Sequence, residues 1–279
     1  MRGGAAVEEG IRRRVAIAVD RRTERRERVP EPTDAEREVA DLLPIAVSEQ
    51  QARETLEQVP LWFHTFSLDG GPLYTPGVAR DHRYRLPALP QDLSGMSVLD
   101  VGTFDGFYAF LAESRGATRV VAIDNEQYRD WVRARWGAEL VGGEGFRAIA
   151  ALLGSRVSYR RLDAFDLDQL DERFDVILCF GILHRVEHPL GLLKALRHRL
   201  GDGGEVLVET YSVARPELEG EAAIHICEPG EVYARDDFVY WGFTGEGLGR
   251  LARLAGFARV EVLGKSTVDG HPRIIASLS

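Results

Sequence analysis

The sequence predicts an α/β protein with one doubly wound sheet, an N-terminal helical extension and an antiparallel strand pair at the C-terminal end. Two observations carry this prediction. From residue 97 onward, short apolar runs alternate with helical patterns, and the last two apolar runs are separated only by a short polar turn. The length of 279 residues suits one such domain with an appended segment. We therefore expect an N-terminal arm and helical lid over residues 1–60 and the main domain over residues 61–279.

The N-terminal extension begins with a charged arm. Residues 1–28 hold nine arginines against five acids, which leaves a net charge of −13 for the rest of the chain. This pattern favours a solvated, partly helical arm, and an anion-binding or subunit-bridging arm is the alternative. Two short helices should follow on either side of Pro44, because two pairs of residues have capping-box spacing. These pairs are Thr33 with Glu36 and Ser48 with Gln51.

The elements of the main domain follow from the spacing of apolar residues. Residues 61–90 are rich in Pro, Gly and aromatic residues and should form an ordered loop. Seven apolar runs then predict strands at 97–101, 119–123, 156–160, 174–180, 205–209, 258–264 and 273–279. Helices are expected at 106–115, 125–136, 144–153, 188–200 and near 244–255. The first five strands should be parallel and the last two antiparallel.

Composition excludes several classes of protein. Hydrophobic residues at 44% and charged residues at 28% are typical of globular chains. Two cysteines, Cys179 and Cys227, are too few for a disulfide framework or a cysteine-rich zinc module, and they fit a reducing compartment. The apolar runs are too short for a membrane helix, and the N-terminus lacks the apolar core of a signal peptide, so we expect a cytoplasmic protein. The net charge of −9 argues against nucleic-acid binding.

The strongest motif is VLDVGTFDGFYAF, residues 98–110. An apolar strand ends near Asp100, turns through Gly102 and Gly106, and enters an apolar helix. Glycine at such a turn lets a ligand approach the backbone, and the start of a helix offers unpaired amide groups. A dinucleotide site needs G-x-G-x-x-G, whereas these glycines are four residues apart with Phe104 between them. The motif therefore disfavours hydride transfer.

Two further acids follow neighbouring strands, at the edge where open α/β sheets bind ligands. Asp124 closes VVAID and can accept hydrogen bonds from both hydroxyl groups of a ribose. Phe165 and Asp166 follow the third strand and could pair an apolar wall with an acceptor for an exocyclic amine, as an adenine requires. Each acid alone is more often a helix cap or a turn residue. Three acids in strand order favour a ligand site.

This arrangement resembles the class I S-adenosylmethionine (SAM)-dependent methyltransferases, whose glycine loop follows the first strand and whose ribose acid ends the second. The resemblance implies a Rossmann-like, seven-stranded sheet with SAM as cofactor, and the terminal antiparallel pair also matches it. It assigns the methionine part of SAM to Asp100, Gly102 and Gly106, the ribose to Asp124, and the adenine to Phe165 and Asp166. Thr103, Asn125 and Phe180 complete the cofactor site that we predict. Phe104 stands where the family often has a third glycine.

A narrower resemblance covers about residues 60–279. The segments WFHTFSLDGGPLYTPG (62–77), FGILHRVEHPLGLLKAL (180–196) and VETYS (208–212) are similar to the methyltransferase group related to the tRNA wobble-uridine carboxymethyltransferases. Those enzymes use carboxy-SAM and hold its extra carboxylate with a tyrosine and basic residues. In this sequence His184 stands at the tyrosine position, which favours ordinary SAM.

His184 is the predicted catalytic residue. It follows the fourth strand, where class I enzymes bring the acceptor and the methyl group together. An imidazole with the usual pKa of ~6.5 can take a proton from a hydroxyl or phenol that attacks the methyl group. The alternative is a helix-entry residue bonded to the backbone.

Two patterns contain metal-ligating residues, but we expect no metal. HRVEH at 184–188 spells the H-x-x-E-H zinc pattern, which needs a helix carrying both histidines, whereas Pro189 follows at once and suits the start of a helix. His225 and Cys227, in IHICEPG, could bind a metal together with His184. A lone pair of such ligands is usually structural.

One histidine and four aromatic residues are predicted to line the acceptor site. They lie before the first strand, after the fifth strand, or in the insertion before the last helix, which is a common place for acceptor contacts in this fold. Each aromatic residue could instead belong to the core, and His64 could be a buried structural histidine. The predicted residues are Trp62, His64, Tyr211, Tyr240 and Trp241.

The sequence thus predicts an enzyme that transfers a methyl group from SAM to a small-molecule acceptor, with an aromatic or polyfunctional metabolite favoured. O-methylation is favoured over C-methylation, because a histidine base suffices for a phenol. One alternative is a methyl- or carboxymethyltransferase acting on the wobble uridine of tRNA, with the basic arm as its RNA contact. Another is a SAM-binding protein without turnover. We expect no membrane or nucleic-acid partner, and the N-terminal segment is a candidate contact between subunits of a homo-oligomer.

Overall fold

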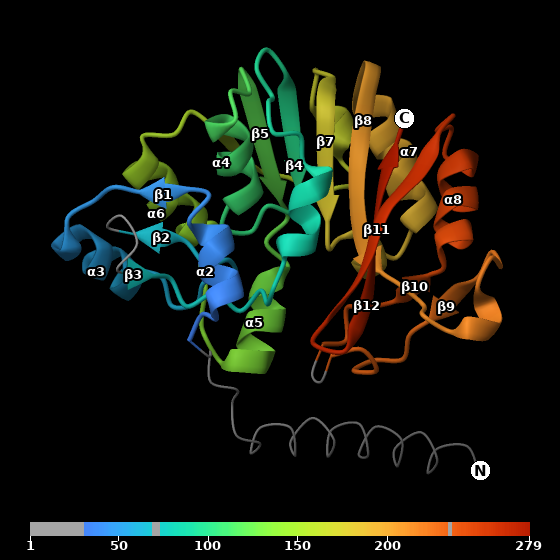
Figure 1. The fold of residues 1–279 in the computed structure, drawn as a ribbon. Helices are drawn as coiled ribbons and strands as arrows, with labels where there is room; N and C mark the ends of the chain where they lie inside the picture. The colour runs from blue at the N-terminus through green and yellow to red at the C-terminus, as the bar shows by residue number, and fades with distance from the viewer. Residues whose placement is uncertain (1–30, 69–72, 234–235) are drawn as a thin grey trace, which may run out of the picture.

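The computed structural model describes residues 31–68, 73–233 and 236–279. A seven-stranded sheet with the order β11-β12-β8-β7-β4-β5-β6 lies at the centre, and helices cover both of its faces (Figure 1). Its strands are β4 (Ser97–Val101), β5 (Arg119–Asp124), β6 (Ser158–Arg161), β7 (Phe174–Phe180), β8 (Leu200–Tyr211), β11 (Val260–Val268) and β12 (His271–Leu278). The structure confirms the doubly wound, Rossmann-like fold with a terminal antiparallel pair that the sequence predicts.

The sheet reverses its direction of growth at β4. From β4 the chain adds β5 and β6 on one side, then returns to add β7 and β8 on the other side, all in parallel. Strand β12 pairs antiparallel with β8, and β11 pairs with the outer edge of β12. The carboxyl ends of β4 and β7 therefore meet at the switch point of the topology, which is where open α/β sheets bind ligands.

Five helices flank the sheet or its loops in the main domain. They are α4 (Phe107–Ser114), α5 (Tyr128–Trp136), α6 (Glu144–Leu153), α7 (Pro189–Arg199) and α8 (Gly245–Leu254). No helix in the described part of the chain is long and apolar enough to cross a membrane. Single 3-10 turns and a small two-stranded sheet complete this region. They are η2 (Leu167–Gln169), η3 (Leu183–Arg185), η4 (Pro216–Leu218), β9 (Ile224–Ile226) and β10 (Trp241–Phe243).

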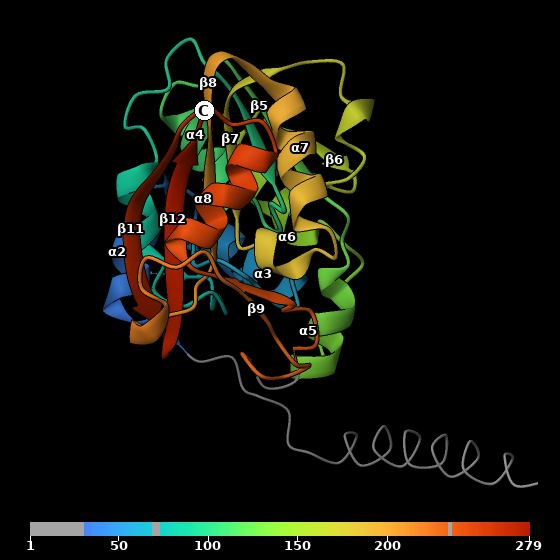
Figure 2. The same ribbon diagram turned by 90° about the vertical axis from the view of Figure 1, so that its right-hand side faces the viewer.

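Alternate residues of each central strand face opposite layers. Val98 lies in one hydrophobic cluster with side chains of α4 and α6, whereas its neighbour Leu99 lies in a second cluster with α7 and α8. Figure 2 shows α7 and α8 next to one another beside the sheet. Because both faces of the sheet are buried, its central strands read as continuous apolar runs.

Helix α5 begins three residues later than predicted, because the chain first makes a turn. Asp124 Oδ1 accepts the N–H of Glu126 at 2.7 Å, and Asn125 Oδ1 accepts the N–H of Gln127 at 3.0 Å. These side chains hold residues 125–127 outside the helix. The other predicted helices and strands agree with the structure, apart from their ends.

The segment before the sheet packs on the same core as α4. Its elements are α2 (Asp34–Ala40), β1 (Pro44–Ile45), α3 (Glu49–Gln58), β2 (Ser67–Leu68), β3 (Leu73–Tyr74) and η1 (Arg83–Ala88). The capping boxes predicted at Thr33 and Ser48 are both present. Val39 of α2 belongs to the hydrophobic cluster that contains Val98. The arm predicted over residues 1–28 lies outside the described residues, and the division of the chain at residue 60 stays a prediction.

The segment over 61–90, predicted as an ordered loop, is held by side-chain and backbone contacts. Thr75 Oγ1 accepts the N–H of Phe66 at 2.8 Å and donates to the carbonyl oxygen of His64 at 2.9 Å. Gly77 lies against the same stretch, and a Cβ at residue 77 would clash with the carbonyl carbon of His64. Glycine at 77 therefore lets two backbone segments meet beside His64.

We expect Gly77→Ala to destabilise the protein by about 1–3 kcal/mol, because the added methyl group clashes with backbone that cannot rotate away. Gly264→Ala is the control, since a Cβ there would make only an ordinary contact, 3.6 Å from Ile275. Urea denaturation of both variants measures the difference. Equal unfolding midpoints for the two variants would contradict the close packing at Gly77.

Candidate functional site

The turn between β4 and α4 is built on two glycines with a left-handed backbone. Gly102 has a φ of 76° and Gly106 a φ of 90°. A Cβ at residue 102 would clash with the side chain of Ile182, so the loop after β7 packs directly on this backbone. Within the turn, Thr103 Oγ1 donates to Asp100 Oδ2 at 2.7 Å. Four of the predicted cofactor residues therefore form one compact unit at the end of β4.

Phe104 occupies the middle of this turn and also has a left-handed backbone, with a φ of 52°. This conformation is unfavourable for a residue with a Cβ, so the backbone at Phe104 is strained. The ring of Phe104 stacks between two others, at 3.8 Å from the ring centroid of Tyr128 and 4.8 Å from that of Phe63. These stacked contacts offset the strain.

Asp100 and Asp124 end neighbouring strands and are both buried. Asp124 accepts hydrogen bonds from the backbone N–H groups of Phe104 at 2.9 Å and Glu126 at 2.7 Å. Burial raises the pKa of each of the two carboxyl groups to about 6, against the effect of the hydrogen bonds that they accept. Asp124, at the end of β5, thus holds the glycine turn that follows β4. Its carboxylate oxygens can still accept further hydrogen bonds.

The other predicted cofactor residues occupy different surroundings. Asn125 Nδ2 donates to Asp163 Oδ2 at 2.7 Å, and Asp163 Oδ1 accepts the N–H of Phe165 at 2.9 Å. Asp163, which the sequence pattern does not single out, therefore ties the loop after β6 to the end of β5. Phe165 is 42% exposed and Asp166 is also exposed, whereas Phe180 is buried at the end of β7.

His184 lies in η3, directly after β7, and is only 1% exposed. Its Nδ1 accepts the N–H of Tyr211 at 3.3 Å and lies 3.2 Å from Oγ1 of Thr210. Burial, together with the nearby charge of Arg273, lowers the pKa of His184 well below its usual 6.5. The ring is therefore neutral near pH 7. Because Nδ1 accepts a backbone hydrogen bond, its proton lies on Nε2.

His64 and Asp105 form a buried pair beside the glycine turn. One oxygen of Asp105 accepts the N–H groups of Phe63 and His64, both at 2.8 Å, and the other contacts Nδ1 of the His64 ring. Nε2 of His64 is buried and has no hydrogen-bond partner among the described residues. In His64, Nδ1 therefore carries the proton and Nε2 can accept a hydrogen bond, whereas in His184 the proton lies on Nε2. The only sequence signal for a role of Asp105 is its position as an acid inside the glycine turn.

Two arginines surround the buried carboxylate of Glu209 near the end of β8. Arg85 Nη2 donates to Oε2 at 2.7 Å, and Arg273 Nη1 lies 3.6 Å from Oε1. Burial alone would raise the pKa of Glu209, but the two guanidinium groups outweigh it and hold the pKa below its usual range. This set has one more positive than negative charge. The only sequence signal for this charged set is Glu209, an acid inside an apolar strand.

The residues predicted to contact the acceptor are not gathered in one place. Trp62 is 1% exposed and lies in the hydrophobic core, which is the alternative interpretation of its aromatic ring. Tyr211 and Tyr240 are half-buried next to His184, and the N–H of Tyr240 donates to the carbonyl oxygen of His184 at 2.8 Å. Trp241 is half-buried in the same insertion and donates from Nε1 to a backbone carbonyl at 2.8 Å.

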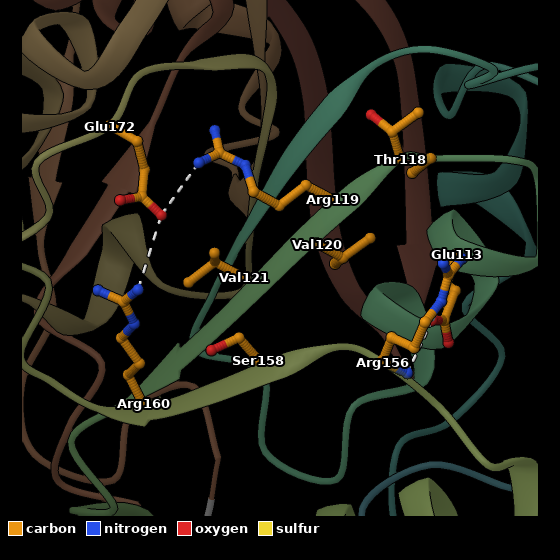
Figure 3. Close-up of a pocket in the computed structure, with 10 residues that line it drawn as sticks. Glu113, Thr118, Arg119, Val120, Val121, Arg156, Ser158, Arg160 and Glu172 are labelled. Carbon is orange, nitrogen blue, oxygen red and sulfur yellow. Dashed lines mark hydrogen bonds and ion pairs between the residues drawn. The ribbon is translucent and has the colours of Figure 1, made fainter.

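A pocket beside the start of β5 and along β6 lies away from these residues (Figure 3). The Glu172 carboxylate lies between the guanidinium groups of Arg119, at 3.2 Å, and Arg160, at 3.6 Å. Arg156 faces Glu113 at 3.8 Å. Since these charges are paired within the pocket, we place the candidate functional site at the carboxyl edge of the sheet.

Comparison with known proteins identifies relatives of this chain. Residues 75–262 match the protein family described as "Methyltransferase domain". The chain is 25% identical over 247 residues to the tRNA U34 carboxymethyltransferase of Sulfurovum sp. (strain NBC37-1), in an alignment that covers 84% of this chain and 74% of the relative. It is 29% identical over 178 residues to the tRNA U34 carboxymethyltransferase of Campylobacter hominis, covering 64% of this chain and 56% of that enzyme. The aligned part thus spans little more than half of the Campylobacter enzyme.

Among solved structures, the chain is similar to the N-terminal domain of EvdMO1, crystallised in the presence of SAH and D-fucose. The TM-score is 0.59 at 20% sequence identity, and the match covers 84% of this chain and 97% of that domain. The same domain with SAH bound gives a TM-score of 0.56. At this level of identity the likeness concerns the fold.

We expect Glu209→Gln to destabilise the protein by about 3–5 kcal/mol, because it leaves two buried guanidinium groups without their counter-charge. The ionised pair stabilises the folded state above pH 4.5, the ordinary pKa of glutamate, and this contribution is lost as the pH falls through the lower folded pKa. The variant should therefore lose this part of the acid dependence. Urea denaturation between pH 3 and 8 measures both effects.

Glu246→Gln is the matched control for this substitution. Glu246 pairs with Arg250 on the surface of α8, at 2.9 Å, so its loss should leave the unfolding midpoint nearly unchanged. If Glu209→Gln were as stable as this control, the buried ion pair would not hold the carboxyl edge together.

Proposed function

This chain belongs to the methyltransferase-domain family, and on that premise we propose that it transfers a methyl group from SAM to a small-molecule acceptor. The observation that carries the proposal is the arrangement at the switch point of the sheet. There a glycine turn lies between two buried acids, Asp100 and Asp124, and leads into the amino end of α4. Backbone amides at a helix start and carboxylates at strand ends are the donors and acceptors that a nucleoside with an amino-acid side chain requires.

The parts of SAM are assigned by the chemistry of each residue. The turn at 102–106 with Asp100 suits the methionine part, whose ammonium group needs an anionic partner. Asp124 has oxygen lone pairs left for the two ribose hydroxyls. Phe165 and Asp166, both exposed at the same edge, suit the flat face and the exocyclic amine of adenine. Asp163 supports this side by holding the backbone of Phe165.

In the proposed transfer, the chain positions the acceptor and provides a side chain that takes up its proton. Bound SAM would supply a methyl carbon on a sulfonium. An acceptor oxygen would bond to that carbon while the electron pair of the broken carbon–sulfur bond stayed on sulfur. Most of the rate then comes from holding the acceptor in line with that bond. We assign Tyr211 and Tyr240 to the acceptor side, because the backbone N–H of each residue contacts His184.

Two histidines compete for the role of base. We retain His184 as the predicted proton acceptor, since it is neutral near pH 7 and follows β7. Its Nδ1 already accepts the N–H of Tyr211, so taking up a proton requires the ring to release that hydrogen bond. His64 is the alternative, because its Nε2 has no partner among the described residues and Asp105 orients the ring through Nδ1.

A second candidate function is methyl or carboxymethyl transfer to the wobble uridine of tRNA. Besides the similarity to tRNA U34 carboxymethyltransferases, one observation favours it. Arg85 and Arg273 carry one positive charge more than Glu209 neutralises, and a carboxylate on the donor would match that charge. The net charge of −9 opposes it, because tRNA binding needs clustered cations.

Native mass spectrometry of the purified full chain tests the donor directly. Retained SAM or its demethylated product would support the first function, and retained carboxy-SAM would support the second. Incubation of each complex with candidate phenols and with unmodified tRNA then identifies the acceptor. Binding of NADH in place of SAM would overturn both proposals.

We expect Asp124→Ala to weaken SAM binding by about 1.5–3 kcal/mol, because the ribose loses a charged acceptor. Asp168→Ala is the control, since Asp168 is exposed on η2 and has no assigned contact with SAM. Isothermal titration calorimetry gives both affinities. Unchanged affinity in a folded Asp124→Ala protein would remove this residue from the site.

We expect His184→Ala to keep SAM affinity nearly intact and to reduce turnover by about 10²–10⁴-fold, the usual effect of removing an acid–base group. Because the pKa of His184 is lowered, the wild-type rate should rise with pH only below 6.5 and be flat above it. The variant should lose this acid limb. If His184→Ala keeps both the rate and the profile and His64→Ala loses them, the base is His64.

We expect no appreciable binding of bulk tRNA at physiological salt, because the chain has 44 acidic residues against 35 basic ones. A gel-shift titration at several salt concentrations measures this. A shift that disappears when residues 1–28 are deleted would reverse the expectation and favour the tRNA function.

A further inference from the structure

Three side chains that commonly bind metals meet in the insertion between β8 and α8. His225 lies on β9, Cys227 follows this strand, and Glu231 comes four residues later. The ligand atoms of these three side chains all lie within 4.8 Å of one another. None of them belongs to the methyltransferase site described above.

The local backbone explains why these side chains converge. Residues 225 and 227 are two apart, so an extended strand directs both to the same side. A turn closed by the N–H of Glu231 donating to the carbonyl oxygen of Glu228, at 2.9 Å, then brings the chain back. The N–H of Glu228 donates to Glu231 Oε2 at 2.7 Å, which leaves Oε1 2.7 Å from His225 Nε2.

We propose that His225, Cys227 and Glu231 bind one Zn²⁺ ion. The set offers one nitrogen, one sulfur and one oxygen, which zinc takes together at distances of about 2.0–2.3 Å, with water as the fourth ligand. A thiolate and a carboxylate would also neutralise the charge of the ion. The sequence analysis expects no metal here, because it considers only His225 and Cys227 with His184 as a possible third ligand. The fold instead brings Glu231 to the other two side chains, and this third ligand is what changes the expectation.

The surroundings suit a metal that fixes the insertion in place. Cys227 is buried in a small apolar cluster with Val232 and Val239, which shields its sulfur from solvent. The N–H of Cys227 donates to the carbonyl oxygen of Tyr240 at 2.9 Å, and the N–H of Tyr240 donates to that of His184 at 2.8 Å. A bound ion would therefore stabilise the strands β9 and β10, which lie at the lower right of Figure 1, and through them the backbone next to His184.

Metal binding by the untagged full chain tests this proposal without an activity assay. Equilibrium dialysis against Zn²⁺ followed by elemental analysis should give one ion per chain. With Co²⁺ as the probe, a tetrahedral spectrum and a thiolate charge-transfer band in the near ultraviolet should appear. Zn²⁺ should also raise the melting temperature, since it binds only the folded site.

Variants separate the proposed site from other surface groups. Cys227→Ser should abolish the charge-transfer band, and His225→Gln should weaken binding by more than about tenfold. Glu228→Gln is the control, because its side chain is exposed and only its backbone contacts the site. If Cys227→Ser fails to fold, His225→Gln carries the same test. Unchanged metal content in both variants, or a Co²⁺ spectrum without the thiolate band, would overturn the proposal.

Discussion

The buried carboxylate of Glu209 is the group on which the carboxyl edge of the sheet depends. It joins Arg85, from the segment before the sheet, and Arg273, from β12, to β8. Neither the acid nor the two cations would be stable in the core without the others. Three stretches that are far apart along the chain are therefore held in one arrangement, and the candidate site lies directly beside it.

Two other carboxylates, those of Asp105 and Asp124, hold the glycine turn. Asp105 accepts backbone N–H groups from residues 63 and 64, and Asp124 accepts one from residue 104. Because the donors are backbone groups, the turn does not depend on flexible side chains for its position. The proposed acceptor side is different, since the insertion that carries β9 and β10 contributes half-buried rings there. The fold thus holds the glycine turn, the proposed cofactor side, more tightly than the proposed acceptor side.

Periodicity and turn chemistry predict most of the fold from the sequence. The apolar runs identify all seven central strands, and the capping boxes place α2 and α3, because these signals are local. The acids at 100 and 124 are found for the same reason, since each stands at or near the end of an apolar strand. Asp105, Arg85 and Arg273 are missed as site residues, because their partners are distant along the chain. The burial of Trp62 and His184 likewise depends on packing that no short window contains.

Strand β12 lies between β8 and β11, although its residues follow those of every other strand in the sheet. On a ribosome, strands β4 to β8 can pair as soon as they emerge. The outer edge of β8, however, stays unpaired until residues 271–278 of β12 have left the exit tunnel. An unpaired edge strand exposes backbone N–H and C=O groups that can pair with another chain. Nascent chains of this protein should therefore expose the edge of β8 during the interval between the emergence of β8 and that of β12.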